Sequence, residues 1–166
     1  LLTAKAERPP HLLAMTATPI PRTLTLTHYG EMDVSRLDEM PPGRQPIETR
    51  VLSQERLDEV IDALGRHIGQ DKQAYWVCPL VEESEVSDLA AAEERHRVLQ
   101  LRFGNVVGLV HGRMKGPEKD AVMAAFQRGE LKVLVATVVI EVGVDVPNAT
   151  LMIIEGADRF GLAQLH

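Results

Sequence analysis

The chain has 166 residues, and its 45% apolar and 25% charged residues are ordinary values for a globular domain that buries a core. Its formal net charge of −6 excludes a strongly basic module that grips DNA or RNA alone, because phosphate binding depends on clustered lysine and arginine. The single cysteine, Cys78, excludes an internal disulfide and is expected to be a small core residue, and the longest apolar run, residues 133–140, is too short to span a bilayer.

The first forty residues are predicted to hold one strand and one helix. Residues 11–15 (HLLAM) are apolar and indicate a buried strand, which ends on Thr16, Ala17 and Thr18. Pro21 suits the first turn of a helix, because its missing N–H needs no partner there. Threonine hydroxyls at a strand end can bind a carboxylate, a water or a phosphate, and the alternative is a turn closed by local side-chain hydrogen bonds.

A cluster of prolines and a glycine between residues 41 and 46 marks a domain boundary, because proline continues neither a helix nor a central strand. We therefore expect one unit in residues 1–40 and a second in residues 41–166. In the second unit, short strands rich in valine and isoleucine alternate with amphipathic helices, which predicts an α/β fold, a parallel sheet with helices on both faces. The expected strands are residues 47–52, 73–81, 105–112, a part of 131–147 and 149–157, and the expected helices are residues 54–69, 84–104 and 115–129.

The carboxyl ends of the later strands carry polar residues, and ligands gather at that edge of open parallel sheets. His111 and Gly112 end one expected strand, and Arg113, Lys115 and Lys119 follow at the start of a helix. A helix N-terminus beside cations suits a phosphate, and the alternative is a solvated basic turn.

Two carboxylates, Glu141 and Asp145, interrupt an apolar run, with Gly143 between them. A buried carboxylate is costly without a partner, and a glycine lets the backbone approach a ligand closely. This group suits a ribose hydroxyl, a metal-bound water or an arginine, and structural ion pairing is the alternative. The last expected strand also ends on charged side chains, which we interpret as a loop salt bridge: Glu155, Asp158 and Arg159.

The chain has neither a GxxxxGK[ST] phosphate loop nor a GxGxxG motif. Three strings nevertheless resemble the C-terminal motor half of a superfamily 2 DNA helicase: MTATPIPRTL (residues 15–24), VGLVHGRMKGPEKDAVMAAF (residues 107–126) and LVATVVIEVGVDVPNATLMIIEGADRFGLAQLH (residues 134–166). The RMK string after HG, with AYWVCPLVEESE upstream, resembles the RecG family of branched-DNA helicases. The transcription-repair coupling factor, which shares the TATPIPRTL and FGLAQLH types of string, is the alternative.

The resemblance implies a motor of two RecA-like lobes, with ATP and Mg²⁺ in the cleft between them in the parent protein. Residues 1–40 would close the first lobe with helicase motif III at Thr16, Ala17 and Thr18, which couples the ATP site to DNA. Residues 41–166 would form the second lobe and stop before motif VI. Because phosphoryl transfer needs a phosphate cradle, a metal and a transition-state arginine, we expect this chain alone to hydrolyse no ATP and to hold no cofactor tightly.

The resemblance also implies roles for motif residues of the second lobe. Glu141, Gly143 and Asp145 would face the nucleotide. Val138 stands where a second threonine is expected after Thr137, which removes one hydrogen bond to a phosphate. The residues implied to contact DNA are His111, Gly112, Arg113, Lys115 and Thr137.

The partners implied are branched double-stranded DNA, such as stalled forks and Holliday junctions in recombination and repair, and the first motor lobe and wedge domain of the parent chain. No membrane is implied, and the expected location is the bacterial cytoplasm in association with the nucleoid. Two other interpretations stay open. One is the motor lobe of the transcription-repair coupling factor, with RNA polymerase as a further partner. The other is a non-enzymatic binding module on the same fold.

Overall fold

The computed structural model describes residues 46–78, 85–137 and 146–160, together with the isolated positions 13, 15, 35, 37 and 39. The chain divides into two compact units, and every helix and strand described below belongs to the larger of them. The helix expected after Pro21 and most of the strand expected at residues 11–15 lie outside the described residues, so both stay predictions.

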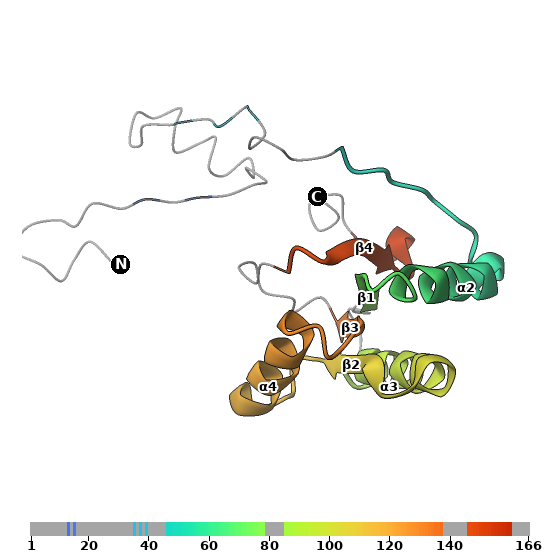
Figure 1. Ribbon diagram of the computed structural model, residues 1–166. Helices are drawn as coiled ribbons and strands as arrows, with labels where there is room; N and C mark the ends of the chain where they lie inside the picture. Colours follow the sequence, from blue (N-terminus) through green and yellow to red (C-terminus); the bar gives the residue numbers. More distant parts are fainter. Residues whose placement is uncertain are drawn as a thin grey trace, which may run out of the picture. The chain divides into compact units, whose positions relative to one another are not determined.

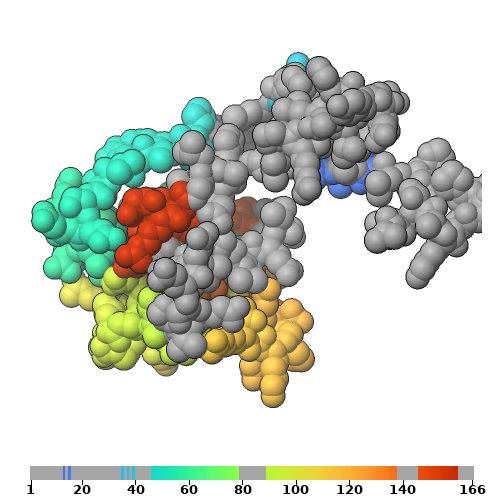
Figure 2. All heavy atoms as spheres, turned by 180° about the vertical axis from the view of Figure 1, so that it is seen from behind, coloured from blue at the N-terminus to red at the C-terminus, as the bar shows by residue number. Residues whose placement is uncertain are grey.

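Four parallel strands form one sheet in the order β2-β3-β1-β4 (Figure 1). This sheet and its helices confirm the predicted α/β fold. The strands are short and apolar because side chains pack on both faces of a parallel sheet. At the β4 edge of this described sheet, strand atoms reach the molecular surface (Figure 2), and Met152 is 56% exposed. The bounds are β1 (Gln73–Cys78), β2 (Val107–Val110), β3 (Val133–Thr137) and β4 (Ala149–Ile154).

Three helices cover the sheet, with α2 and α3 on one face and α4 on the other (Figure 1). Their bounds are α2 (Leu57–Ile68), α3 (Glu85–Phe103) and α4 (Gly116–Gln127), so the helices expected at residues 54–69, 84–104 and 115–129 are confirmed. Short 3-10 turns are η1 (Gln54–Arg56), η2 (Gly104–Val106) and η3 (Ala157–Arg159). None of the helices in the described ranges combines the length and the apolar content that crossing a membrane requires.

The larger core lies between the sheet and the two helices α2 and α3. Alternate residues of β1, Ala74, Trp76 and Cys78, belong to it, as the two-residue period of a strand requires. Leu64 of α2 and Leu99 of α3 are fully buried against them. Cys78 is 2% exposed, which confirms the prediction of a core cysteine. Burial, reinforced by the nearby Glu155 carboxylate, raises the pKa of its thiol to about 12, so the group stays a neutral thiol.

The smaller core lies between α4 and the opposite face of the sheet. Phe126 of α4 is fully buried against Leu134, and its ring centre lies 5.0 Å from that of Tyr75. Gly108 of β2 allows this close packing, because a Cβ at that position would lie 3.2 Å from Cγ1 of Val122 in α4 and 2.6 Å from Cδ1 of Leu131, which follows the helix. The position of α4 on the sheet therefore depends on the large ring of Phe126 and on the lack of a side chain at Gly108.

The strand expected at residues 47–52 is wrong. This segment has no regular secondary structure, and Ile47 and Val51 are 76% and 93% exposed. The segment contains the β-branched residues Ile47, Thr49 and Val51, which suit a strand, but a strand also needs a neighbouring backbone to pair with. In the described part of the chain, the strands of the sheet pair only with one another.

Candidate functional site

The strand register brings several polar residues to the carboxyl edge of the sheet. Val77 of β1 pairs with Ala136 of β3 and with Ile154 of β4, and Val110 of β2 also pairs with Ala136. The four strands therefore end at nearly the same level. The next residue along three of these strands lies at this common edge: His111 after β2, Thr137 at the end of β3 and Glu155 after β4.

A basic turn, residues 111–115, joins β2 to α4. The backbone N–H of Met114 donates to the carbonyl of His111 at 3.2 Å, and the N–H of Arg113 donates to Nδ1 of His111 at 3.3 Å. The Met114 side chain packs against the core under α4 and anchors the turn. Lys115 is the N-cap of α4, whose first turn contains Pro117. Cationic side chains and the positive end of the helix dipole thus meet at one place, which suits a phosphate group.

Thr137, on the neighbouring strand, is level with the start of the basic turn. It pairs with Cys78 of β1 and is 3% exposed, so the residue is buried at the strand end. The structure thus brings Thr137 to the same edge as the residues that the resemblance implied to contact DNA, namely His111, Gly112, Arg113 and Lys115. Their role in binding DNA stays a prediction.

Glu155 has a different partner from the one that the sequence suggested. The interpretation of Glu155, Asp158 and Arg159 as a loop salt bridge does not hold for Glu155, because this residue pairs with Arg95 in the middle of α3. Nη2 of Arg95 lies 2.6 Å from Oε1, and Nε lies 2.8 Å from Oε2. The indole Nε1 of Trp76 also donates to Oε2 at 2.9 Å, and the guanidinium lies 5.2 Å from the centre of the Trp76 ring. We call Arg95, Trp76 and Glu155 the carboxylate cluster.

The carboxylate cluster keeps Glu155 ionised although it is largely buried. Burial opposes ionisation, but the hydrogen bonds from Arg95 and Trp76 outweigh it and hold the pKa of Glu155 below its usual value of 4.5. For Arg95, burial would lower the pKa, and the ion pair with Glu155 reverses this and raises it. Both groups are therefore charged at neutral pH.

Acid is expected to destabilise the carboxylate cluster. In the unfolded chain Glu155 takes up its proton near pH 4.5, whereas in the folded chain its pKa is lower. The stabilisation from ionised Glu155 is thus complete above the unfolded pKa and is lost as the pH falls through the lower, folded value. Urea unfolding followed by emission of Trp76, the one tryptophan of the chain, should give a free energy of unfolding that decreases as the pH falls below about 5. Glu155→Gln should weaken this dependence, and an unchanged dependence would contradict the prediction.

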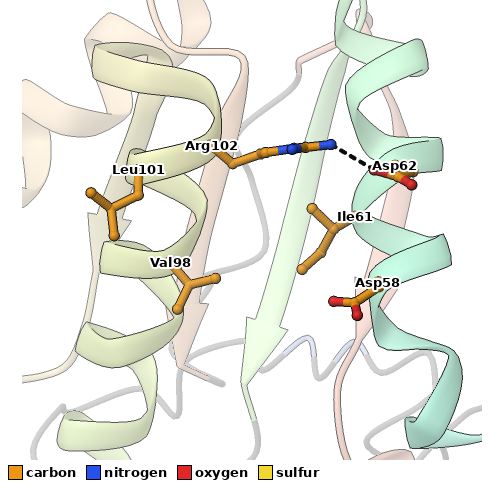
Figure 3. Close-up of a pocket in the computed structure, with 6 residues that line it drawn as sticks. All are labelled: Asp58, Ile61, Asp62, Val98, Leu101 and Arg102. Atoms are coloured by element: carbon orange, nitrogen blue, oxygen red, sulfur yellow. Dashed lines mark hydrogen bonds and ion pairs between the residues drawn. The ribbon is translucent and has the colours of Figure 1, made fainter.

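An open groove of about 520 Å³ lies between α2 and α3 (Figure 3). Ile61, Val98 and Leu101 form its apolar part. Arg102 reaches across to Asp62, with Nη2 2.9 Å from Oδ1. Both members of this ion pair are more than half exposed, so solvent screens their attraction. The groove brings together no set of groups for catalysis, and the carboxyl edge remains the stronger candidate site.

Several predicted site residues lie outside the described residues, namely Thr16, Ala17, Thr18, Glu141, Gly143 and Asp145. Within the described ranges, no group of three histidine, cysteine, aspartate or glutamate side chains could hold a metal ion. Sequence reasoning missed Arg95 and Trp76 as partners of Glu155. No local signal pointed to them, because 60 and 79 residues separate these two side chains from Glu155.

Comparison with known proteins gives a consistent result. Residues 55–166 match the family model of the helicase conserved C-terminal domain. The chain is 57% identical over 158 residues to the ATP-dependent DNA helicase RecG of Acidithiobacillus ferridurans, covering 95% of this chain and 23% of the relative. It is 57% identical to RecG of Escherichia coli K12 and 50% identical to RecG of Bacillus subtilis 168, with the same two coverages. The chain therefore spans about a quarter of the length of these relatives.

A solved structure of RecG bound to a three-way DNA junction is similar to the chain in fold. The TM-score is 0.71 and the sequence identity is 43%, over 90% of this chain and 19% of that chain. Together with the family match, this likeness confirms the predicted RecA-like fold of a second helicase lobe.

Proposed function

Because the chain belongs to the helicase conserved C-terminal domain family, we propose that it forms the second motor lobe of an ATP-dependent DNA helicase of the RecG type. The longer protein would use Mg²⁺ and ATP to move on double-stranded DNA and to remodel branched DNA, including stalled forks and Holliday junctions. Its first motor lobe and wedge domain would be the partners of this lobe. We further propose that it acts at the bacterial nucleoid, in recombination and repair.

One observation supports the proposal above all others. The basic turn begins next to Thr137, because β2 and β3 end at the same height at the carboxyl edge of the sheet. A duplex backbone presents a row of phosphates, and the cations of the basic turn at the start of α4 suit one of them. We propose that Arg113 and Lys115 neutralise phosphates and that His111 and Gly112 shape the turn. Thr137 would add a hydroxyl contact at the neighbouring strand.

The remaining motif residues complete the proposed motor. Glu141, Gly143 and Asp145 would face the nucleotide, and Thr16, Ala17 and Thr18 would couple the nucleotide site of the first lobe to the DNA path. Phosphoryl transfer requires a phosphate cradle, a metal and an arginine that stabilises the transition state. We propose that other parts of the longer protein supply these groups, so that this chain alone hydrolyses no ATP and, with its net charge of −6, binds DNA weakly.

Hydrolysis of ATP by the full-length protein tests the proposal. The rate is measured without DNA, with a linear duplex and with a model replication fork of equal length. We expect the fork to stimulate hydrolysis more than the linear duplex, because the proposed substrate is branched DNA. If no DNA stimulates hydrolysis, the chain is a binding module on the helicase fold and the proposed function is wrong.

A further inference from the structure

The carboxylate cluster connects the segment that follows β4 with helix α3. Strand β1 contributes Trp76 to this connection. Trp76 belongs to β1, which pairs with β4, and Arg95 comes from the helix above the sheet. The side chains of Arg95 and Glu155 are 14% and 25% exposed, and Trp76 is fully buried. Three hydrogen bonds from two elements therefore converge on one carboxylate.

Glu155 stands where the chain changes direction. Its backbone N–H donates to the carbonyl of Val77 at 2.9 Å, which extends the pairing of β1 and β4 by one bond. The next residue, Gly156, has a φ of +60°, a left-handed conformation, and turns the chain into η3. The backbone of Glu155 is thus fixed by β1 while its side chain is fixed by α3 and β1 together.

An ion pair with this burial contributes more to orientation than to stability. The cost of removing both charges from water offsets most of their attraction, so apolar replacements of similar size are often neutral or stabilising. The two-pronged bond between a guanidinium and a carboxylate, in contrast, allows one relative orientation. The cluster is therefore suited to hold the turn after β4 in a single direction.

We propose that Arg95, Trp76 and Glu155 act as positioning residues, which orient the turn at residues 156–160 and thereby support ATP turnover by the motor. This inference rests on the proposed function, because the turn leaves the same sheet edge as the basic turn and Thr137. Glu155 is bonded within the lobe and acts through the backbone that follows it.

The decisive variant is the double substitution Arg95→Met with Glu155→Gln. It removes both charges together and keeps an amide oxygen that accepts from Nε1 of the buried Trp76, so that the lobe still folds, whereas either single change leaves one partner of the ion pair unmatched. Arg97→Met is the matched control, because Arg97 lies two positions further along α3 and makes a similar ion pair with Glu94. That pair also has a 2.6 Å contact, but both side chains are about 60% exposed.

Hydrogen exchange and kinetics give two separate readouts. In the chain itself, we expect the double variant to exchange the amides of residues 156–160 about tenfold faster, with a normal free energy of unfolding, while Arg97→Met exchanges like the wild type. In the full-length protein, we expect the double variant to lower kcat for ATP about tenfold with KM unchanged. Arg95→Lys with native Glu155 should restore part of kcat, because lysine keeps the positive charge but cannot form the two-pronged hydrogen bond of the guanidinium group.

Each result decides a different point. Unchanged exchange at residues 156–160 in the double variant would show that the cluster does not orient the turn, and a wild-type kcat would show that its orientation does not support turnover. Either result overturns the inference. A wild-type protein without DNA-stimulated hydrolysis would instead refute the proposed function, and the exchange experiment would still decide whether the cluster positions the turn.

Discussion

Replacing Phe126 with alanine is expected to lower the free energy of unfolding by about 3–5 kcal/mol, the range for large aromatic residues in a core. Phe126 is fully buried and is the largest residue that α4 places against the sheet. Its ring packs on Leu134 and Tyr75. Two neighbouring carbonyls, those of Phe126 and Leu131, accept hydrogen bonds from Nε2 of the buried Gln73 at 2.6 and 2.8 Å, which holds the backbone in place and prevents collapse of the cavity.

Urea or thermal unfolding of the chain measures this loss, with Leu101→Ala as the control. Leu101 lies on α3 and is 77% exposed, so its truncation should change the free energy of unfolding by less than about 0.5 kcal/mol. A loss below about 1 kcal/mol for Phe126→Ala would mean that α4 does not depend on this residue for its position. Because α4 begins at the basic turn, we expect the same variant to weaken DNA binding at temperatures where α4 is loosened.

The double substitution Arg113→Gln with Lys115→Gln is expected to weaken DNA binding by the full-length protein about 10- to 100-fold near 0.1 M salt. Each cation that neutralises a phosphate releases about one counterion, so losing two should make the slope of log K against log salt less steep by about 1.8. The loss should be similar for forked DNA of any sequence, because phosphate contacts carry no base information. Fluorescence anisotropy over a range of salt concentrations measures both quantities.

The matched control removes two cations at the opposite, amino edge of the sheet. Arg66 lies in the last turn of α2 and Lys72 immediately precedes β1, and both are exposed. Arg66→Gln with Lys72→Gln changes the net charge by the same amount, but it should leave the salt slope unchanged. Equal effects of the two double variants would show that only overall charge matters, and the basic turn would lose its assigned role.

The helices and most strands were predictable because their signals are local. The spacing of apolar residues along α2, from Leu57 to Ile68, defines one buried face without reference to the rest of the chain. The basic turn was predictable for the same reason, since its cations follow a strand and precede a helix in one short stretch. The resemblance implied a role for Thr137 in DNA contact, but only the structure showed that Thr137 ends β3 and is level with His111.

The errors concern interactions between distant parts of the chain. The composition of residues 47–52 resembles that of a strand, yet whether such a segment joins a sheet depends on a partner strand that lies outside the segment. Glu155 was grouped with Asp158 and Arg159 in a loop salt bridge because the three are close in sequence, whereas the fold brings Glu155 to Arg95. Parallel strands and the helices over them join residues far apart in sequence, so contacts of this kind escape a local reading.

The order of the strands in the sheet also affects the synthesis of the protein. β1 is a central strand, but both of its neighbours, β3 and β4, are made after it. At about 5–20 residues per second, a ribosome needs several seconds to reach the end of β4 once β1 is complete. Until β3 has been made, the apolar side chains of β1, Trp76 among them, have no neighbouring strand, and the other edge of β1 stays unpaired until β4 follows. A nascent-chain chaperone would therefore be most useful to this lobe in the period between the emergence of β1 and that of β4.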